Sequence, residues 1–512
     1  MDDTRRTRGS RIGFWSGPIV ALVIGSTWTP DTAVLTRLLP VDRQFDPAVI
    51  SVVAALAAWM AIWWMTEAVA IAVTSLLPMV LLPWLVGAPF DLGRVAANYA
   101  NWRVYLFFGG FLIAIAMETS GLHRRVALLT VRAVGTNPRR IVLGFMMATA
   151  ALSMWISNTA TTLMMMPIGK AVIDRFQNRK RFATALMLGI AYAASIGGVA
   201  TPIGTPPNIA FQGIYARLYP QAPPIGFAEW MAFALPLSVV FLPIMWLLLV
   251  FRIRSHAGDG RQVLEHEISL LGPATAAQKR VFAVFAATAA LWIFRRPMPL
   301  GSFHLPGWQA WIPAQGLNDG VVAMTMGMLL FVLPSGERGE RLLRWRDVER
   351  KMPWGILVLF GGGFALADAV GASGLSAWVG GRFDALAGLS PLLLIAGTVA
   401  VLTFLTEITS NTATAQIMLP LAAAVATTAA GVHPLVMMLP VTVAASFAFM
   451  LPVATPPNAV VFGSGLVPMR EMIRHGFALN LIGILLLTLF CYWLAPVVFG
   501  IDLGAGIPAW AR

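Results

Sequence analysis

Apolar stretches about as long as a membrane crossing recur along almost the whole of this sequence. A helical crossing needs about 20 apolar residues, and charged residues make up only 12% of the 512 residues, against about 25% in soluble domains. The sequence therefore predicts an all-α polytopic membrane protein. The candidate helices lie near 13–29, 48–65, 68–86, 104–121, 141–173, 183–217, 231–251, 277–294, 319–334, 354–372, 390–429, 433–463 and 475–499.

Four of these apolar runs are too long for one crossing, and each contains a polar or proline-rich interruption. A crossing takes about 17 to 25 residues, whereas long interrupted segments are typical of re-entrant hairpins and broken helices. We therefore expect hairpins over 141–173 and 390–429, and broken helices over 183–217 and 433–463.

The basic residues predict the orientation of the chain. The formal net charge is +13, but short basic clusters between apolar runs follow the positive-inside rule and do not indicate nucleic-acid binding. All clusters fall on the cytoplasmic side if hairpin 141–173 enters from inside and hairpin 390–429 from outside. This arrangement gives about eleven crossings of the cell (inner) membrane, a cytoplasmic N-terminus and an external C-terminus. The clusters lie at 5–11, 124–140, 175–181, 252–261, 338–351 and 470–474.

Four groups of residues recur in the same order, which indicates an internal duplication. Because the first hairpin has basic flanks and the second has only Arg382 nearby, the two halves are expected to face opposite ways, as in the inverted repeats of secondary transporters. The recurring groups are Trp102, Phe108, Gly109 and Gly110 with Trp354, Phe360, Gly361 and Gly362; Ser120-Gly121-Leu122 with Ser373-Gly374-Leu375; Ser157-Asn158-Thr159-Ala160-Thr161 with Ser410-Asn411-Thr412-Ala413-Thr414; and Thr205-Pro206-Pro207-Asn208 with Thr455-Pro456-Pro457-Asn458.

The duplication and the charge pattern together predict how the chain is divided. The charge-rich stretch 335–352 is expected to lie on the membrane surface as an amphipathic helix. The expected parts are an N-terminal tail with the first helix over 1–47, repeat 1 over 48–252, a cytoplasmic linker over 253–276, repeat 2 over 277–502 and a C-terminal tail over 503–512.

The repeated polar motifs are suited to binding small ions inside the membrane. Unsatisfied polar groups cost several kcal/mol there, so the tip residues need partners. Hydroxyl, amide and carbonyl oxygens suit a small cation, and helix N-termini suit a carboxylate. Ser153 and Thr406 lie one turn before Ser157 and Ser410, so their hydroxyls can face the tips. The alternative is that these residues only join and kink helices, but the duplication of both motifs favours a binding site.

Acidic residues inside apolar runs are further functional candidates. Glu118 and Asp368 lie within such runs, and Glu407 lies between Thr406 and Ser410. Glu407 either carries a proton or tunes a cation site, or it pairs structurally with an arginine or with backbone amides. The structural interpretation is the favoured one.

The remaining motifs exclude several classes of protein. The single cysteine, Cys491, excludes a disulfide framework, and the sequence has no phosphate-binding loop, nucleophile elbow or zinc-protease motif. We therefore expect no enzyme activity and no organic cofactor. Lys170, about three turns from the first tip, is the nearest basic residue there, so bound cations and helix N-termini must neutralise an anionic substrate. This favours cation symport.

The motifs resemble those of a known transporter family. SNTATT at 157–162, SNTATA at 410–415 and the paired TPPN segments are similar to the signature of the divalent anion/sodium symporter family, which includes sodium-coupled dicarboxylate, citrate and sulfate transporters. The resemblance extends over about 48–500 and includes TEAVAIAVTSLLP at 66–78 and GLHRRVAL at 121–128. It implies an elevator-type transporter, usually a homodimer, whose transport domain carries both hairpins and both broken helices and moves against a scaffold domain.

The resemblance also implies roles for individual residues. One sodium ion would bind Ser153, Ser157, Asn158 and the Gly204 carbonyl, and a second would bind Thr406, Ser410, Asn411 and the Ala454 carbonyl. The substrate carboxylates would contact Asn158, Thr159, Asn411 and Thr412, with Thr205, Pro206, Thr455 and Pro456 lining the site.

The sequence thus predicts a secondary transporter that moves small divalent oxyanions, above all C4-dicarboxylates such as succinate, malate and fumarate, by sodium symport. The alternatives are a sodium-independent exchanger of dicarboxylates, tricarboxylates or sulfate, because the family also contains exchangers with similar tips, and an anion channel.

Overall fold

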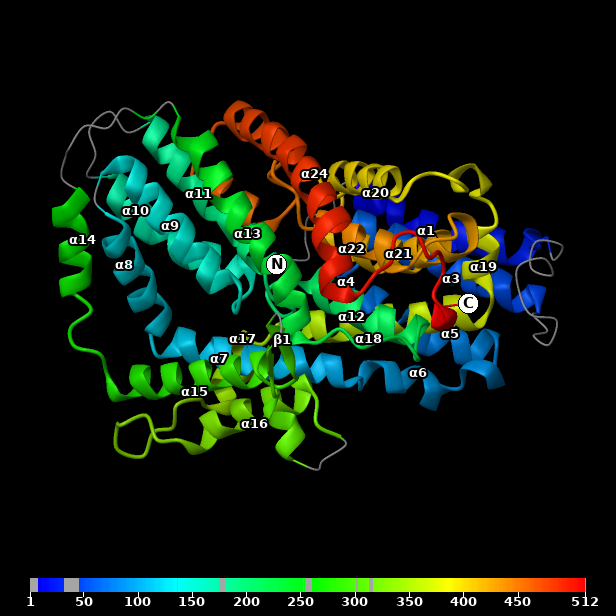
Figure 1. Ribbon diagram of the computed structural model, residues 1–512, viewed down its shortest axis with the longest axis horizontal. Coiled ribbons are helices and arrows are strands. Elements are labelled where there is room, and N and C mark those ends of the chain that lie inside the picture. The colour runs from blue at the N-terminus through cyan, green and yellow to red at the C-terminus, as the bar shows by residue number, and fades with distance from the viewer. Residues whose placement is uncertain are drawn as a thin grey trace.

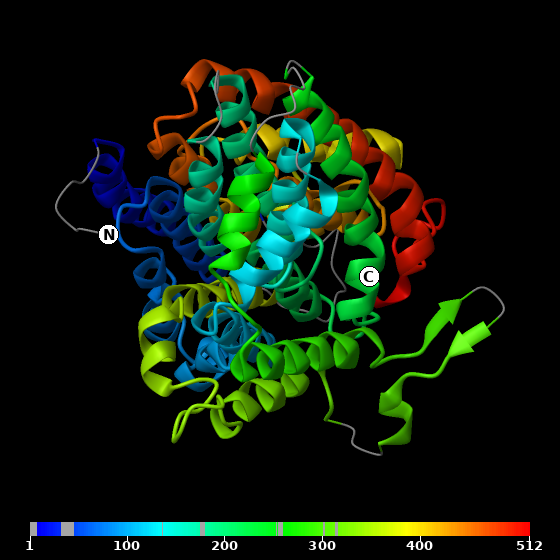
Figure 2. The same ribbon diagram turned by 90° about the vertical axis from the view of Figure 1, so that its left-hand side faces the viewer.

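A computed structural model describes residues 8–31, 46–135, 137–174, 180–251, 253, 260–300, 303–312 and 316–511. Outside these ranges lie the basic residues Arg5, Arg6, Arg175 and Arg179 and, at the start of the expected linker, residues 254–259. The fold is helical except for a short antiparallel hairpin, β1 (Met298–Leu300) with β2 (Phe303–Leu305), which projects from the body of the molecule (Figure 2). The predicted fold class, an all-α polytopic membrane protein, is therefore confirmed.

Among the described residues, seven helices have the length and apolar composition of a membrane span. Shorter apolar helices complete the set, since hairpin arms and half-helices cross only part of a bilayer. The seven spans are α3 (Pro47–Thr66), η1 with α6 and α7 (Ala88–Thr119), α11 (Lys180–Val199), α13 (Phe227–Val250), α18 (Trp354–Ala372), α21 with the π-helical turn η4 (Asn411–Ala429) and α24 (Met469–Phe499).

Two helical hairpins have their open ends at opposite ends of the molecule. Helix α9 (Pro138–Ser153) turns back into α10 (Asn158–Ile173), and α20 (Pro391–Leu405) turns back into α21 (Asn411–Ala424). Figure 1 shows α9 and α10 opening toward the end that carries α14 (Gly260–Ser269), whereas α20 and α21 open toward the end that carries α5 (Leu77–Leu85). This is the opposite placement expected of an inverted repeat.

Two further segments are helices interrupted in the middle. Helix α11 ends at Val199 and α12 (Pro206–Leu218) follows; α22 (Leu435–Ala444) is followed by α23 (Pro456–Gly463). In both cases two prolines occupy the start of the second half-helix, where the missing N–H costs nothing. The interruption leaves the residues between the half-helices in irregular backbone inside the protein.

The two halves of the chain interlock through these half-helices. Helix α10 of the first hairpin packs against α23 of the second broken helix, and α12 packs against α21. Helix α12 also packs against α18, which in turn packs against α6 (Leu92–Tyr99). Along the lower edge of Figure 1, α7 (Trp102–Thr119), α15 (Ala276–Ile293) and α16 (Asp319–Val332) form a layer beside this interlocked part.

The expected surface helix over 335–352 is mostly wrong. Only α17 (Trp345–Lys351) is helical, and the preceding residues form a turn closed by a bridge between Pro334 and Arg341. Gly336 and Gly339 both have positive φ, a conformation that glycine adopts readily and that stops a helix. The charge alternation of this stretch therefore belongs to a polar turn.

The remaining helices connect and cover these parts. They are α1 (Arg8–Thr27), α4 (Ile71–Thr74), α8 (Leu122–Val134) and α19 (Leu375–Gly380), together with the short 3₁₀ turns η2 (Trp308–Trp311), η3 (Asp384–Leu386) and η5 (Ala509–Ala511).

Candidate functional site

The tip of the first hairpin forms a compact cluster of polar atoms with helix α11. The Ser153 hydroxyl donates to the Ala194 carbonyl at 2.7 Å and lies 2.7 Å from the side-chain amide of Asn158. Ser153 is fully buried, and Asn158 begins α10 directly after the tip. The cluster therefore joins the end of α9, the start of α10 and the last turns of α11.

The Asn158 amide has two orientations with different chemical consequences. With its oxygen toward the cluster, that oxygen lies 3.1 Å from the Ala194 carbonyl and 3.2 Å from the Gly204 carbonyl; with the amide turned over, its nitrogen donates to both carbonyls and to Ser153. Carbonyl and amide oxygens this close together repel one another unless a proton or a cation lies between them. The first orientation thus presents four converging oxygens to a small hard cation.

Asn208 of α12 stabilises the break between α11 and α12 by hydrogen bonds to the backbone. Its side-chain nitrogen donates to the carbonyls of Gly198, Val199 and Thr201 at 3.2, 3.1 and 2.7 Å. These are carbonyls left without helical partners where α11 ends. A Cβ atom on Gly198 would lie 2.3 Å from Oδ1 of Asn158, so only glycine lets the end of α11 approach the tip this closely.

The tip of the second hairpin repeats the first arrangement almost atom for atom. The Thr406 hydroxyl donates to the Ala445 carbonyl at 2.8 Å and lies 2.7 Å from Oδ1 of Asn411. Asn458 donates to the Ala448 and Leu451 carbonyls at 3.0 and 3.1 Å. Since the two tips belong to different halves of the chain, the molecule carries two related oxygen clusters.

Glu407 lies beside the second cluster and not the first. Its side chain bonds to the backbone between α22 and α23. Its carboxylate accepts hydrogen bonds from the backbone N–H groups of Phe449, Met450 and Leu451 at 2.7–3.1 Å. Asn480 of α24 donates to it at 2.8 Å. These bonds fit the interpretation that Glu407 pairs with backbone amides, and they leave its carboxylate engaged as an acceptor.

The other expected site residues lie at the same helix starts, with different contacts. Ser157 caps α10 by accepting from the Ala160 N–H at 3.3 Å, and Thr455 caps α23 by accepting from the Asn458 N–H at 3.3 Å. Ser410 and Thr205 precede α21 and α12 without a side-chain cap. Thr159 and Thr412 are half-buried in the first turns of α10 and α21, Pro206 and Pro456 begin α12 and α23, and Ala454 is buried just before α23.

The structure brings some of these residues together and not others. Ser153, Asn158 and Gly204 meet in the first cluster, and Thr406 meets Asn411 in the second. Among the described hydrogen bonds, none links Ala454 to Asn411. The hydroxyl, amide and helix carbonyl are thus arranged alike at both tips.

Sequence reasoning missed the two carbonyls that anchor the clusters, those of Ala194 and Ala445. A backbone carbonyl has no side-chain signature. One signal was present, however: Ala193-Ala194-Ser195 recurs as Ala444-Ala445-Ser446 before each TPPN segment, which extends the duplication into both helices that face the tips.

Neutral polar groups make up the described hydrogen bonds of these clusters. The described hydrogen bonds to Ser153, Asn158, Thr406 and Asn411 involve hydroxyl, amide and carbonyl groups, and none comes from Lys or Arg. The N-termini of α10, α12, α21 and α23, which begin at the tips and breaks, offer partial positive charge to an anion. Clusters of oxygen atoms thus lie beside helix N-termini.

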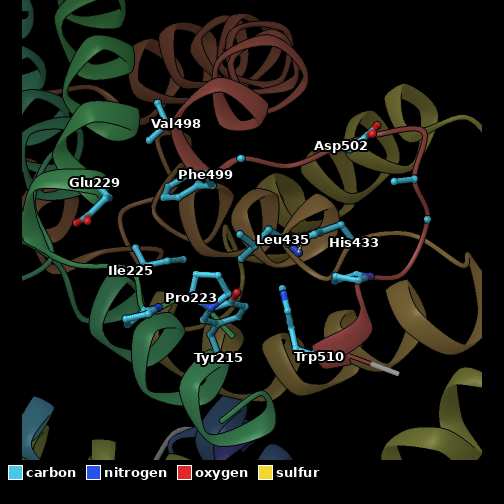
Figure 3. Close-up of a pocket in the computed structure, with 15 residues that line it drawn as sticks. Tyr215, Pro223, Ile225, Glu229, His433, Leu435, Val498, Phe499, Asp502 and Trp510 are labelled. Atoms are coloured by element: carbon cyan, nitrogen blue, oxygen red, sulfur yellow. Dashed lines mark hydrogen bonds between the residues drawn. The ribbon is translucent and has the colours of Figure 1, made fainter. Parts of the chain in front are cut away.

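A cavity of about 340 Å³ lies elsewhere and does not fit an anionic substrate. It is bordered by the end of α12, the start of α22 and the C-terminal residues, with Tyr215, His433 and Trp510 around it (Figure 3). Its lining contains the acidic residues Glu229 and Asp502, whose negative charge opposes an anion, and it includes none of the expected site residues.

Comparison with known proteins points to one family of membrane transporters. Residues 31–501 match the family model described as the sodium:sulfate symporter transmembrane region. The chain is 41% identical over 509 residues to the sodium-dependent dicarboxylate transporter SdcS of Staphylococcus saprophyticus, covering 96% of this chain and 94% of that protein. It is 39% identical over 513 residues to the protein of the same name from the bovine strain of Staphylococcus aureus, covering 97% and 94%.

Two solved structures share the fold at 14% sequence identity and a TM-score of 0.55. They are the YdaH transporter of Alcanivorax borkumensis, which covers 82% of this chain and 90% of its own, and MtrF of Neisseria gonorrhoeae, which covers 96% and 100%. At this identity the likeness supports the architecture alone.

Proposed function

This chain belongs to the sodium:sulfate symporter family of membrane transporters, and within that family we propose that it moves C4-dicarboxylates such as succinate, malate and fumarate together with sodium ions. The proposal rests on the relatives named sodium-dependent dicarboxylate transporter and on one structural observation. That observation is the pair of related oxygen clusters at the two hairpin tips, each beside helix N-termini and without a hydrogen-bonded Lys or Arg.

The electrostatic requirement explains why these features belong together. A dianion inside the membrane is prohibitively costly unless positive charge accompanies it. Helix N-termini supply only partial charges, so sodium ions at the oxygen clusters would complete the neutralisation. In this proposal Ser153, Ser157, Asn158 and Gly204 hold one ion, and Thr406, Ser410, Asn411 and Ala454 hold the other.

The substrate would then lie between the two tips. Asn158 and Thr159 from the first tip, with Asn411 and Thr412 from the second, would contact its carboxylates. Thr205-Pro206 and Thr455-Pro456 would line the space around it. Each tip would therefore contribute to both a sodium ion and a carboxylate, which links the binding of one to the binding of the other.

We further propose an elevator motion for the transport step. The transport domain would comprise both hairpins and both broken helices, and the scaffold domain would include α6, α7 and α18 and hold a homodimer together. The chain would cross the cytoplasmic membrane with its N-terminus inside and its C-terminus outside, as the basic clusters require.

Uptake into proteoliposomes tests this function. Purified protein is reconstituted, and labelled succinate uptake is measured with an inward sodium gradient and with the same gradient of potassium. The proposal expects concentrative uptake with sodium only. Uptake that is independent of sodium and requires an anion inside the vesicles would establish the exchanger instead, and a steady succinate conductance would establish a channel.

A further inference from the structure

Asp368 inside α18 is a single carboxylate contacted by two arginines, an arrangement that the transport site does not explain. Its side chain is only 10% exposed, yet two arginines from different elements contact it. Arg94 of α6 binds both carboxylate oxygens, with Nε and Nη2 each at 3.1 Å. Arg217, in the last turn of α12, contacts Oδ2 through Nη2 at 2.7 Å.

The two arginines are held in different ways. Arg94 is fixed independently of Asp368, because its Nη1 donates to the Pro89 carbonyl at 2.8 Å and its guanidinium lies over the Phe90 ring at 5.0 Å. Both arginines are similarly exposed, at 38% and 37%, but Arg217 reaches Asp368 from α12, the helix that begins at the Thr205-Pro206 break. Arg94 and Asp368 thus both lie on the α6 and α18 side of the contact between α12 and α18. Arg217 reaches Asp368 from the α12 side of this contact.

We propose that Asp368 is a positioning residue whose contact with Arg217 holds α12 against α18 in one conformation of the transport cycle and is released in the other. This inference rests on the proposed elevator motion, in which α12 travels with the transport domain while α18 and α6 stay in the scaffold. A hydrogen-bonded ion pair does not survive a displacement of a few ångströms.

The presence of Arg94 makes that release reversible. A buried carboxylate that loses its only cation is strongly destabilising, but Asp368 keeps its paired arginine when Arg217 leaves. Arg217, being more than a third exposed, can return to water. The arrangement therefore favours one conformation without locking the protein in it.

A cross-linking experiment can measure occupancy of this conformation. A Cβ atom on Gly371 would lie 3.1 Å from Cδ2 of Leu218, so cysteines at these positions on α18 and α12 are within reach of a short bis-thiol reagent. The only native cysteine, Cys491, is buried and is replaced by serine. The rate of cross-linking between L218C and G371C is then compared among variants.

We expect Arg217→Gln and Asp368→Asn each to slow cross-linking at least about threefold, and the double variant to slow it no further, because both remove the same contact. Arg217→Lys should restore most of the rate. Labelling of L218C alone with a monofunctional maleimide corrects for changes in thiol reactivity beside Arg217, and thermal unfolding in detergent identifies variants that are merely misfolded.

The matched control is Lys351→Gln. It breaks the Lys351–Glu118 pair, which also spans 2.7 Å and whose cation is exposed to the same 37% as Arg217. The Lys351–Glu118 pair has a more exposed carboxylate, and it joins α17 to the end of α7 within the proposed scaffold. Cross-linking should stay unchanged in this control. Unchanged cross-linking in Arg217→Gln, or an equal loss in Lys351→Gln, would overturn the proposal. Cross-linking does not depend on transport. The result of this experiment can therefore be read even if sodium-coupled uptake is not observed.

Discussion

At the scale of single residues, the two tip asparagines are the centre of the account. Asn158 and Asn411 each begin the second arm of a hairpin and each lie 2.7 Å from a buried hydroxyl, that of Ser153 or Thr406. A side-chain amide at this position can present its oxygen to a cation while its neighbours bind an anion. Alanine keeps the helix but removes the oxygen.

We therefore expect Asn158→Ala and Asn411→Ala each to reduce sodium-driven succinate uptake at least about a hundredfold, equivalent to about 2.7 kcal/mol. Membrane insertion should be unaffected, as judged by yield and by size-exclusion behaviour in detergent. Retained uptake in both variants would refute the assignment of the site to the hairpin tips.

Glu407 makes a contrasting prediction, because its bonds are structural. Replacing it with glutamine turns an amide NH₂ group toward backbone N–H donors, and leaving buried donors unpaired costs about 1–3 kcal/mol. Glu407→Gln should thus lower the stability of the protein in thermal unfolding. The control Glu118→Gln removes an exposed ion pair and should cost under about 1 kcal/mol.

The two interpretations of Glu407 differ in pH dependence. If it serves only as a backbone acceptor, the shape of the curve of uptake against pH is the same in wild type and in Glu407→Gln. A curve that loses a titration step in the variant would show instead that Glu407 carries a proton during transport.

At the scale of elements, the first cluster depends on how closely the end of α11 approaches the tip of the α9–α10 hairpin. Gly198→Ala places a Cβ atom 2.3 Å from the Asn158 amide, a distance at which something must move. We expect this variant to raise the sodium concentration for half-maximal uptake at least about tenfold, a loss of about 1.4 kcal/mol. Gly397→Ala on α20, where nothing lies within 4 Å, should behave as wild type.

The elements also show what could be predicted from the sequence. Long apolar runs with polar interruptions correctly indicated a helical membrane protein, since the lengths of hydrophobic stretches follow from the bilayer itself. The surface helix over 335–352 was wrong because two glycines with positive φ form a turn there. The Ala194 and Ala445 carbonyls were missed because backbone groups depend on tertiary packing, which residue types do not record.

At the scale of the whole molecule, the opposite direction of the two hairpins is the feature on which alternating access would depend. Arg140 lies at the open end of the first hairpin and Leu389 just before the second, and both are exposed. In a background with Cys491 replaced by serine, we expect Arg140→Cys to react with a membrane-impermeant maleimide only from the cytoplasmic side and Leu389→Cys only from outside. Labelling of both from one side would contradict the inverted orientation.

The central claim for the whole molecule is that sodium supplies the positive charge that the binding site lacks. Binding of sodium and succinate should then be coupled reciprocally, each raising the affinity for the other by the same factor. The most direct test is isothermal titration of succinate into the purified protein at increasing sodium concentrations, with choline keeping the ionic strength constant. We expect the affinity for succinate to rise at least about a hundredfold from sodium-free to sodium-saturated buffer, a coupling of about 2.7 kcal/mol. Equal succinate affinity with and without sodium would contradict it.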